Sequence, residues 1–197
     1  KIGEVIMLAT NLQPFLMGIV VSVLVGAALT LPISSAAICA AFGLTGLAGG
    51  AAVAGCCAQM IGFAIMSFKE NGWGGLVSQG IGTSMLQMGN IIKNPRIWIA
   101  PIVTSAITGP VATCLFKLQM NGTAVSSGMG TCGFVGQIGV YSGWVNDVAA
   151  GTKSAITMMD WAGLILISFV LPAVICPLIN WLLKKAGWVK DGDMKLQ

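Results

Sequence analysis

The stretch from Ile33 to Phe68, ISSAAICAAFGLTGLAGGAAVAGCCAQMIGFAIMSF, contains 36 residues and no charged side chain. Two further runs are also free of charge, 20 residues from Ile97 to Phe116 and 23 residues from Trp161 to Leu183. A helix needs about 20 apolar residues to cross a hydrocarbon core of about 30 Å. A soluble domain of this size has no core that would bury three such runs. The runs therefore predict an integral membrane protein.

The composition agrees with this prediction. Charged residues are 8% of the chain and hydrophobic residues 56%, whereas an ordinary soluble domain has about 25% charged residues. Alternating segments of about 10 residues, typical of membrane barrels, are missing. We predict an all-α polytopic helical membrane protein with about four spanning helices, centred on residues 12–31, 35–68, 97–118 and 161–183. Residues 1–185 are the expected transmembrane transport domain, and residues 186–197 the expected cytoplasmic tail.

The run from Ser35 to Phe68 is too long for one upright crossing. A continuous helix of 34 residues would extend about 51 Å, and glycines cluster in its middle. We therefore predict a break or strong tilt near Gly46–Gly50, with a hinge at Gly49–Gly50. Gly46 and Gly50 form a GxxxG pair, which we interpret as a site of close helix packing rather than a dimer face.

Two segments between the apolar runs are rich in glycine and in uncharged polar residues. Gly74–Asn90 and Gly122–Asp147 are too polar to face lipid, and we predict two re-entrant hairpins that enter the membrane from opposite faces. Their amides and hydroxyls suit a hydroxylated solute, although the same groups also join helices in many membrane proteins. The predicted substrate-binding residues are Gln79, Thr83, Ser84, Gln87, Asn90, Ser126, Thr131, Gln137, Asn146 and Asp147.

The distribution of lysine and arginine predicts the orientation, because these residues favour cytoplasmic loops. The tail after Leu183, the turn at Lys93–Arg96, the loop at Lys69 and the N-terminus are all expected inside. Lys117 and Lys153 are then expected outside or in a cavity. The expected location is a cell membrane, the bacterial inner or plasma membrane, with several crossings.

Several classes of function are excluded. The chain has no histidine, so no Ser-His or Cys-His pair exists, and it has no P-loop; we expect no catalytic residues. Its six cysteines include no CxxC pair and are expected to be small buried hydrophobes, with no metal site and no cofactor. No basic stripe with interleaved aromatic residues indicates nucleic acid.

Several short stretches resemble one membrane family: GWGG at 72–75, QGIGTS at 79–84, NPRIWIAP at 94–101, TGP at 108–110 and the segment 128–139. Along its whole length the chain resembles the PfoR-like branch of phosphotransferase-system EIIC membrane proteins, as the C-terminal part of a longer member. The resemblance implies the permease subunit of a sugar-phosphorylating phosphotransferase system, a homodimer, and soluble phosphoryl-carrier proteins as partners. The glutamate and histidine that better-known sugar EIIC proteins place near the sugar are missing here.

Three functions remain open at this point. The first is a substrate-translocating subunit that binds a small polar solute, a sugar, between the two hairpins. The second is a membrane sensor or regulator that keeps the fold without transport, and the third is a channel. A transporter saturates and moves solute, whereas a sensor binds solute without flux.

Overall fold

The computed structural model describes residues 2–196, and within this range the chain is helical and contains no β-strand. The predicted all-α class is confirmed. By length and composition, three of the described helices are able to cross a membrane. They are α4 (Gly46–Met66), the continuous helix Pro95–Leu115 that contains α7 (Ile99–Pro110), and the helix Met158–Lys185 that contains α10 (Met158–Ile165) and α11 (Leu171–Lys185).

The expected number of about four spanning helices is therefore not confirmed. The first expected span became α2 (Pro14–Thr30), which has 17 residues. At 1.5 Å per residue it is about 26 Å long, shorter than a hydrocarbon core of about 30 Å. Its first turn begins at Pro14, which has no N–H to satisfy there.

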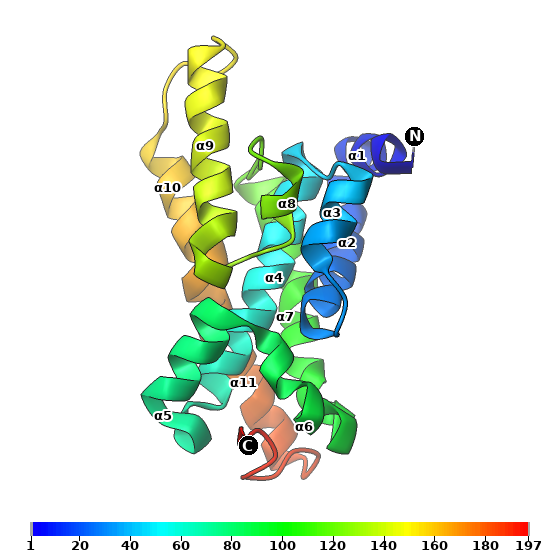
Figure 1. Ribbon diagram of the computed structural model, residues 1–197, viewed down its shortest axis with the longest axis vertical. Coiled ribbons are helices and arrows are strands. Elements are labelled where there is room, and N and C mark those ends of the chain that lie inside the picture. Colours follow the sequence, from blue (N-terminus) through cyan, green and yellow to red (C-terminus); the bar gives the residue numbers. More distant parts are fainter. Residues whose placement is uncertain (1, 197) are drawn as a thin grey trace.

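Helix α4 is the centre of the molecule, and Figure 1 shows it running along the long axis beside α7 and α11. It packs against α2, α7 and α11. Its residues are mainly alanine, glycine and cysteine, and most are buried. Small side chains let the neighbouring backbones approach closely: a Cβ on Gly50 would collide with the carbonyl oxygen of Leu118. Gly50 of the GxxxG pair is therefore a site of close packing, but against the loop residue Leu118 and not against another helix.

The long apolar run is broken, but not at the predicted hinge. It divides into α3 (Ser35–Phe42) and α4, which are separated by Gly43–Thr45. Gly43 closes α3 in the left-handed conformation at φ 60°, a common helix terminator that favours glycine. Gly49 and Gly50 lie inside the uninterrupted helix α4, so the hinge placed there was wrong. These two glycines contribute close packing rather than flexibility.

This break changes the position of the N-terminal helix. In Figure 1, α3 rises and α4 descends, so the run contributes two antiparallel helices where one crossing was expected. Helix α1 (Ile2–Leu12) consequently lies at the upper end of the molecule, opposite the C-terminal end. The expectation that both ends of the chain share one side is wrong for the described residues; Lys1 itself lies outside the described range.

The two polar segments form hairpins at opposite ends of the molecule. The lower one comprises α5 (Phe68–Val77), the turns Ser78–Gly82 and Ser84–Gln87, and α6 (Met88–Lys93). The upper one comprises α8 (Ala124–Ser127), the turn Cys132–Phe134 and α9 (Val135–Ala149). Figure 1 shows α5 and α6 at the lower end and α9 at the upper end.

Positive charge is concentrated at the lower end, where α5, α6 and the C-terminus meet in Figure 1. It carries Lys69, Lys93, Arg96, Lys184, Lys185, Lys190 and Lys195. The Lys184 ammonium donates to Asp191 at 2.6 Å and lowers the pKa of that exposed carboxyl.

We expect the lower end to face the cytoplasm. In a cysteine-free background, single Lys93→Cys and Lys190→Cys variants should react with a membrane-impermeant maleimide only from the cytoplasmic side. Ser154→Cys, in the exposed turn after α9, should react only from outside. Labelling of Lys93→Cys in intact cells would contradict this orientation.

Candidate functional site

The predicted amides of the lower hairpin form one buried chain of hydrogen bonds. Asn90 donates its amide to Gln87 at 2.8 Å, and Gln87 donates to Gln79 at 2.8 Å. Gln79 in turn donates to the Ser67 hydroxyl at 2.8 Å. Gln79 and Gln87 are fully buried and Asn90 is 8% exposed. The lower hairpin thus carries an internally paired amide network, which avoids the cost of burying unsatisfied polar groups.

A second polar cluster surrounds Gln59, at the centre of the molecule. The Gln59 side-chain oxygen accepts hydrogen bonds from Thr30 at 3.1 Å and from the Trp98 indole at 2.9 Å. Thr30 also pairs with Ser84 of the lower hairpin at 2.9 Å. Ser84 is among the predicted substrate-binding residues, whereas Gln59 is not. The available signal was that Gln59 is the only amide in the charge-free run from Ile33 to Phe68.

The two hairpins meet directly. The Thr131 hydroxyl, in the upper hairpin, donates to the carbonyl oxygen of Gly80, in the lower hairpin, at 2.6 Å. Three residues near Thr131 have positive φ, namely Gly130, Gly133 and Phe134. Glycine adopts this conformation without steric cost, so the strain lies at Phe134. Phe134, at φ 58°, is the costly member, since a left-handed residue other than glycine loses about 1–2 kcal/mol. Such strain is typical of functional segments.

The remaining predicted residues of the upper hairpin are more dispersed. Gln137 donates to Ser168 at 3.0 Å, and its buried side-chain oxygen has no partner among the described residues. Ser126 pairs with Thr123 inside the hairpin at 2.8 Å. Asn146 is exposed on α9. In the lower hairpin, Thr83 caps its own turn by accepting from the Met85 N–H at 3.1 Å.

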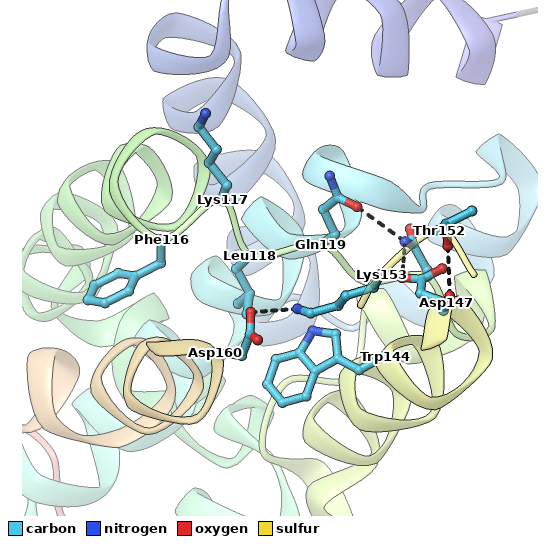
Figure 2. A pocket seen from close by; sticks show the side chains of 10 residues that line it. Phe116, Lys117, Leu118, Gln119, Trp144, Asp147, Thr152, Lys153 and Asp160 are labelled. Atoms are coloured by element: carbon cyan, nitrogen blue, oxygen red, sulfur yellow. Dashed lines mark hydrogen bonds and ion pairs between the residues drawn. The ribbon is translucent and has the colours of Figure 1, made fainter. Parts of the chain in front are cut away.

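Asp147 lies in an open pocket at the upper end, with a volume of about 450 Å³. This volume falls in the range of about 300–1,000 Å³ typical of small-molecule sites. Figure 2 shows the lining residues, which come from the loop after the Pro95–Leu115 helix, α9, the loop between α9 and α10, and the start of α10. They are Phe116, Lys117, Leu118, Gln119, Asn121, Trp144, Asp147, Thr152, Lys153 and Asp160.

The pocket combines paired charges with an aromatic wall. The Asp147 carboxylate accepts from Asn121 at 2.7 Å, and Lys153 forms an ion pair with Asp160 at 2.7 Å. Figure 2 shows the Lys153 ammonium beside Trp144, at 5.4 Å from the ring centroid. Asp160 also belongs to a capping box with Thr157, which fixes the start of α10.

The two tryptophans at the hairpin edges have different roles. Trp144 is 3% exposed and forms part of the pocket wall. Trp73 is 75% exposed at the lower end, where an interfacial anchor is expected.

A smaller pocket of about 360 Å³ opens at the lower end, between α6 and the C-terminal residues. Asn90 lines it together with Lys93 and Asn94. The predicted site residues therefore occupy successive levels along the long axis, from the lower pocket through the hairpin contact to the upper pocket, and do not share one cavity.

The chemistry available along this axis is hydrogen bonding and charge pairing. No group of histidine, cysteine, aspartate and glutamate suited to a metal occurs in the described range. Amides and hydroxyls both donate and accept, which matches neutral hydroxylated solutes.

The comparisons with known proteins give one positive finding. The family model described as "Phosphotransferase system, EIIC" matches residues 1–196. Comparisons with curated proteins and with solved structures gave no match. The match covers nearly the whole chain and agrees with its apolar helices. The chain therefore belongs to the phosphotransferase-system EIIC family, whose members are membrane components of that transport system.

Proposed function

We propose that this chain is the substrate-translocating part of a phosphotransferase-system transporter in a bacterial cell membrane, and that its solute is a sugar that passes between the two hairpins. The observation that carries the proposal is the contact between Thr131 and Gly80, which lies between pockets at the two ends. The hairpins are re-entrant in this proposal. Soluble phosphoryl carriers and a second copy of the protein complete the assembly.

The closed arrangement of the hairpins favours an occluded state. Gln79, Ser84, Gln87 and Thr131 are fully buried and hydrogen-bonded within the protein. Solute hydroxyls are able to replace these internal partners at little net cost, because both arrangements keep the amides satisfied. Alternate opening of the hairpins towards the upper and lower pockets then moves solute across.

The upper pocket is the proposed entry. Its aspartate and amides provide acceptors and donors for hydroxyl groups, and the Trp144 wall supplies an apolar surface. The lower pocket, beside Asn90, is the proposed exit towards the phosphoryl carriers.

The first test is sugar binding and uptake by the full-length protein in proteoliposomes. Gln87→Ala and Asp147→Asn each remove or weaken a hydrogen-bonding group on the proposed path. We expect each to weaken solute binding about 5- to 150-fold, the range that corresponds to losing about 1–3 kcal/mol. Yield of folded protein should not change for Asp147→Asn, because the amide keeps the shape of the carboxylate.

Gln13→Ala is the matched control for Gln87→Ala, because Gln13 is exposed and its side chain does not cap α2. If the Gln87→Ala and Asp147→Asn variants bind and take up sugar as well as the parent protein, the polar groups of the hairpins only join helices. Saturable binding without uptake in the parent protein would favour the sensor function.

A further inference from the structure

The C-terminal tail, residues Gly187–Leu196, is held firmly against the lower hairpin instead of extending freely after α11. Val189 is 2% exposed and Met194 is fully buried. Both side chains pack into the apolar cluster that includes Phe63, Ile91 and Ile97. A segment of ten residues with two buried apolar anchors is therefore part of the folded structure.

The tail bonds to both arms of the lower hairpin. On the α5 side, Glu70 accepts from the backbone N–H groups of Gly192 at 3.0 Å and Met194 at 2.9 Å. Asn71 donates to the Met194 carbonyl at 2.8 Å and accepts from the Leu196 N–H at 2.7 Å. The Glu70 carboxylate thus binds the main chain of the tail from α5.

On the α6 side, the tail supplies partners for the buried amides of the proposed path. Gln87 donates to the Met194 carbonyl at 2.9 Å, and Asn90 donates to the Lys195 carbonyl at 3.0 Å. Asn94 donates to the Asp193 carboxylate at 2.7 Å. The Met194 carbonyl oxygen accepts one hydrogen bond from each arm of the hairpin, from the amides of Asn71 and Gln87.

We propose that the tail is a releasable latch: it clamps the two arms of the lower hairpin and occupies the amides of Gln87 and Asn90, so that the path at the lower end opens only when the tail detaches. The claim that detachment opens a solute path rests on the proposed function. The claim that the tail holds the hairpin closed is independent of the proposed function. Peptide carbonyls resemble solute hydroxyl oxygens as acceptors, so tail and solute compete for the same amides.

The test uses the full-length protein with its native cysteines replaced and one reporter cysteine added. Val189→Cys reports on detachment of the tail. Ile91→Cys reports on exposure of the hairpin, since Ile91 is 4% exposed and belongs to the same apolar cluster. Met194→Ser removes the larger anchor. We expect it to raise the maleimide reaction rate of both reporters about 10- to 100-fold, as losing the burial of one methionine implies.

Lys195→Ser is the matched control, because the Lys195 side chain is exposed and its contact with Asn90 uses only the main chain. It should change the rates by no more than about twofold. If Met194→Ser lowers the yield of folded protein, Glu70→Gln replaces it. That variant weakens the latch from the hairpin side and should raise both rates about fivefold or more.

Each result decides one claim. Unchanged rates for both reporters, or a rise for Val189→Cys without a rise for Ile91→Cys, would overturn the latch. A rise for both, with faster sugar uptake than the parent, supports it. A rise for both with uptake identical to or slower than that of the parent would overturn the gating role. If no variant, parent included, takes up solute, the proposed function fails while the labelling still decides whether the tail holds the hairpin.

Discussion

Replacing Gly55 by leucine is expected to abolish the folded protein. Gly55 lies where α2 crosses α4, and a Cβ there would collide with the Ser22 carbonyl group of α2. The crossing is equally tight from the side of α2, since a Cβ on Gly26 of that helix would lie 2.7 Å from the Gly55 carbonyl oxygen. Both obstacles are backbone atoms in helices, so neither rotates away. Inserting extra carbons into a packed core costs about 1–3 kcal/mol, and this site has no room to relax.

Gly89→Leu is the matched control, because nothing lies within 4 Å of a Cβ at that position of α6. Extraction in mild detergent followed by size-exclusion chromatography measures the yield of folded, monodisperse protein. We expect near-parental yield for Gly89→Leu and a loss of most folded material for Gly55→Leu. Similar yields would mean that α2 and α4 are not in close contact.

Gln59→Leu is expected to produce the second largest effect. It leaves the Trp98 indole N–H without the acceptor that now binds it and removes one of the two partners of the Thr30 hydroxyl, which keeps Ser84. A buried donor left unpaired costs about 1–3 kcal/mol. We therefore expect a clear fall in the thermal unfolding temperature, together with reduced uptake, because Thr30 connects Gln59 to Ser84 of the lower hairpin.

A double-substitution cycle separates this explanation from a simple packing defect. Trp98→Phe removes the indole donor, so its effect should add less than fully to that of Gln59→Leu. Gln13→Leu is the control, because Gln13 is exposed and its side chain does not cap α2. Strict additivity of Gln59→Leu and Trp98→Phe would show that the indole–amide bond contributes little.

The sequence predicted the class of the fold because the decisive signal is local. Charge-free runs of 20 residues or more require a membrane, and the polar density of Gly74–Asn90 and Gly122–Asp147 marked the two hairpins. The hinge was misplaced because glycine has two uses that composition does not separate. Gly43 terminates a helix at positive φ, whereas Gly49 and Gly50 allow close packing within one.

The candidate site was only partly predictable, because pairing between distant segments is not visible in one sequence. The link between Thr131 and Gly80 spans 51 residues, and the bond from Gln87 to Met194 spans 107. Gln59 had a local signal, an amide alone in an apolar run. The tail had none, because its bonds to Gln87 and Asn90 use main-chain carbonyls that every sequence possesses.

The most direct test of the central claim is to join the hairpins covalently and measure sugar uptake. A Gly80→Cys, Thr131→Cys double variant in a cysteine-free background places thiols where the hairpins touch, and a Cβ on Gly80 has room at 3.5 Å from its nearest neighbour. Oxidation, or a short bis-thiol reagent, should then stop uptake, and release of the cross-link should restore it. Each single-cysteine variant should keep its uptake under the same treatment. Undiminished uptake by fully cross-linked protein would contradict passage between the hairpins.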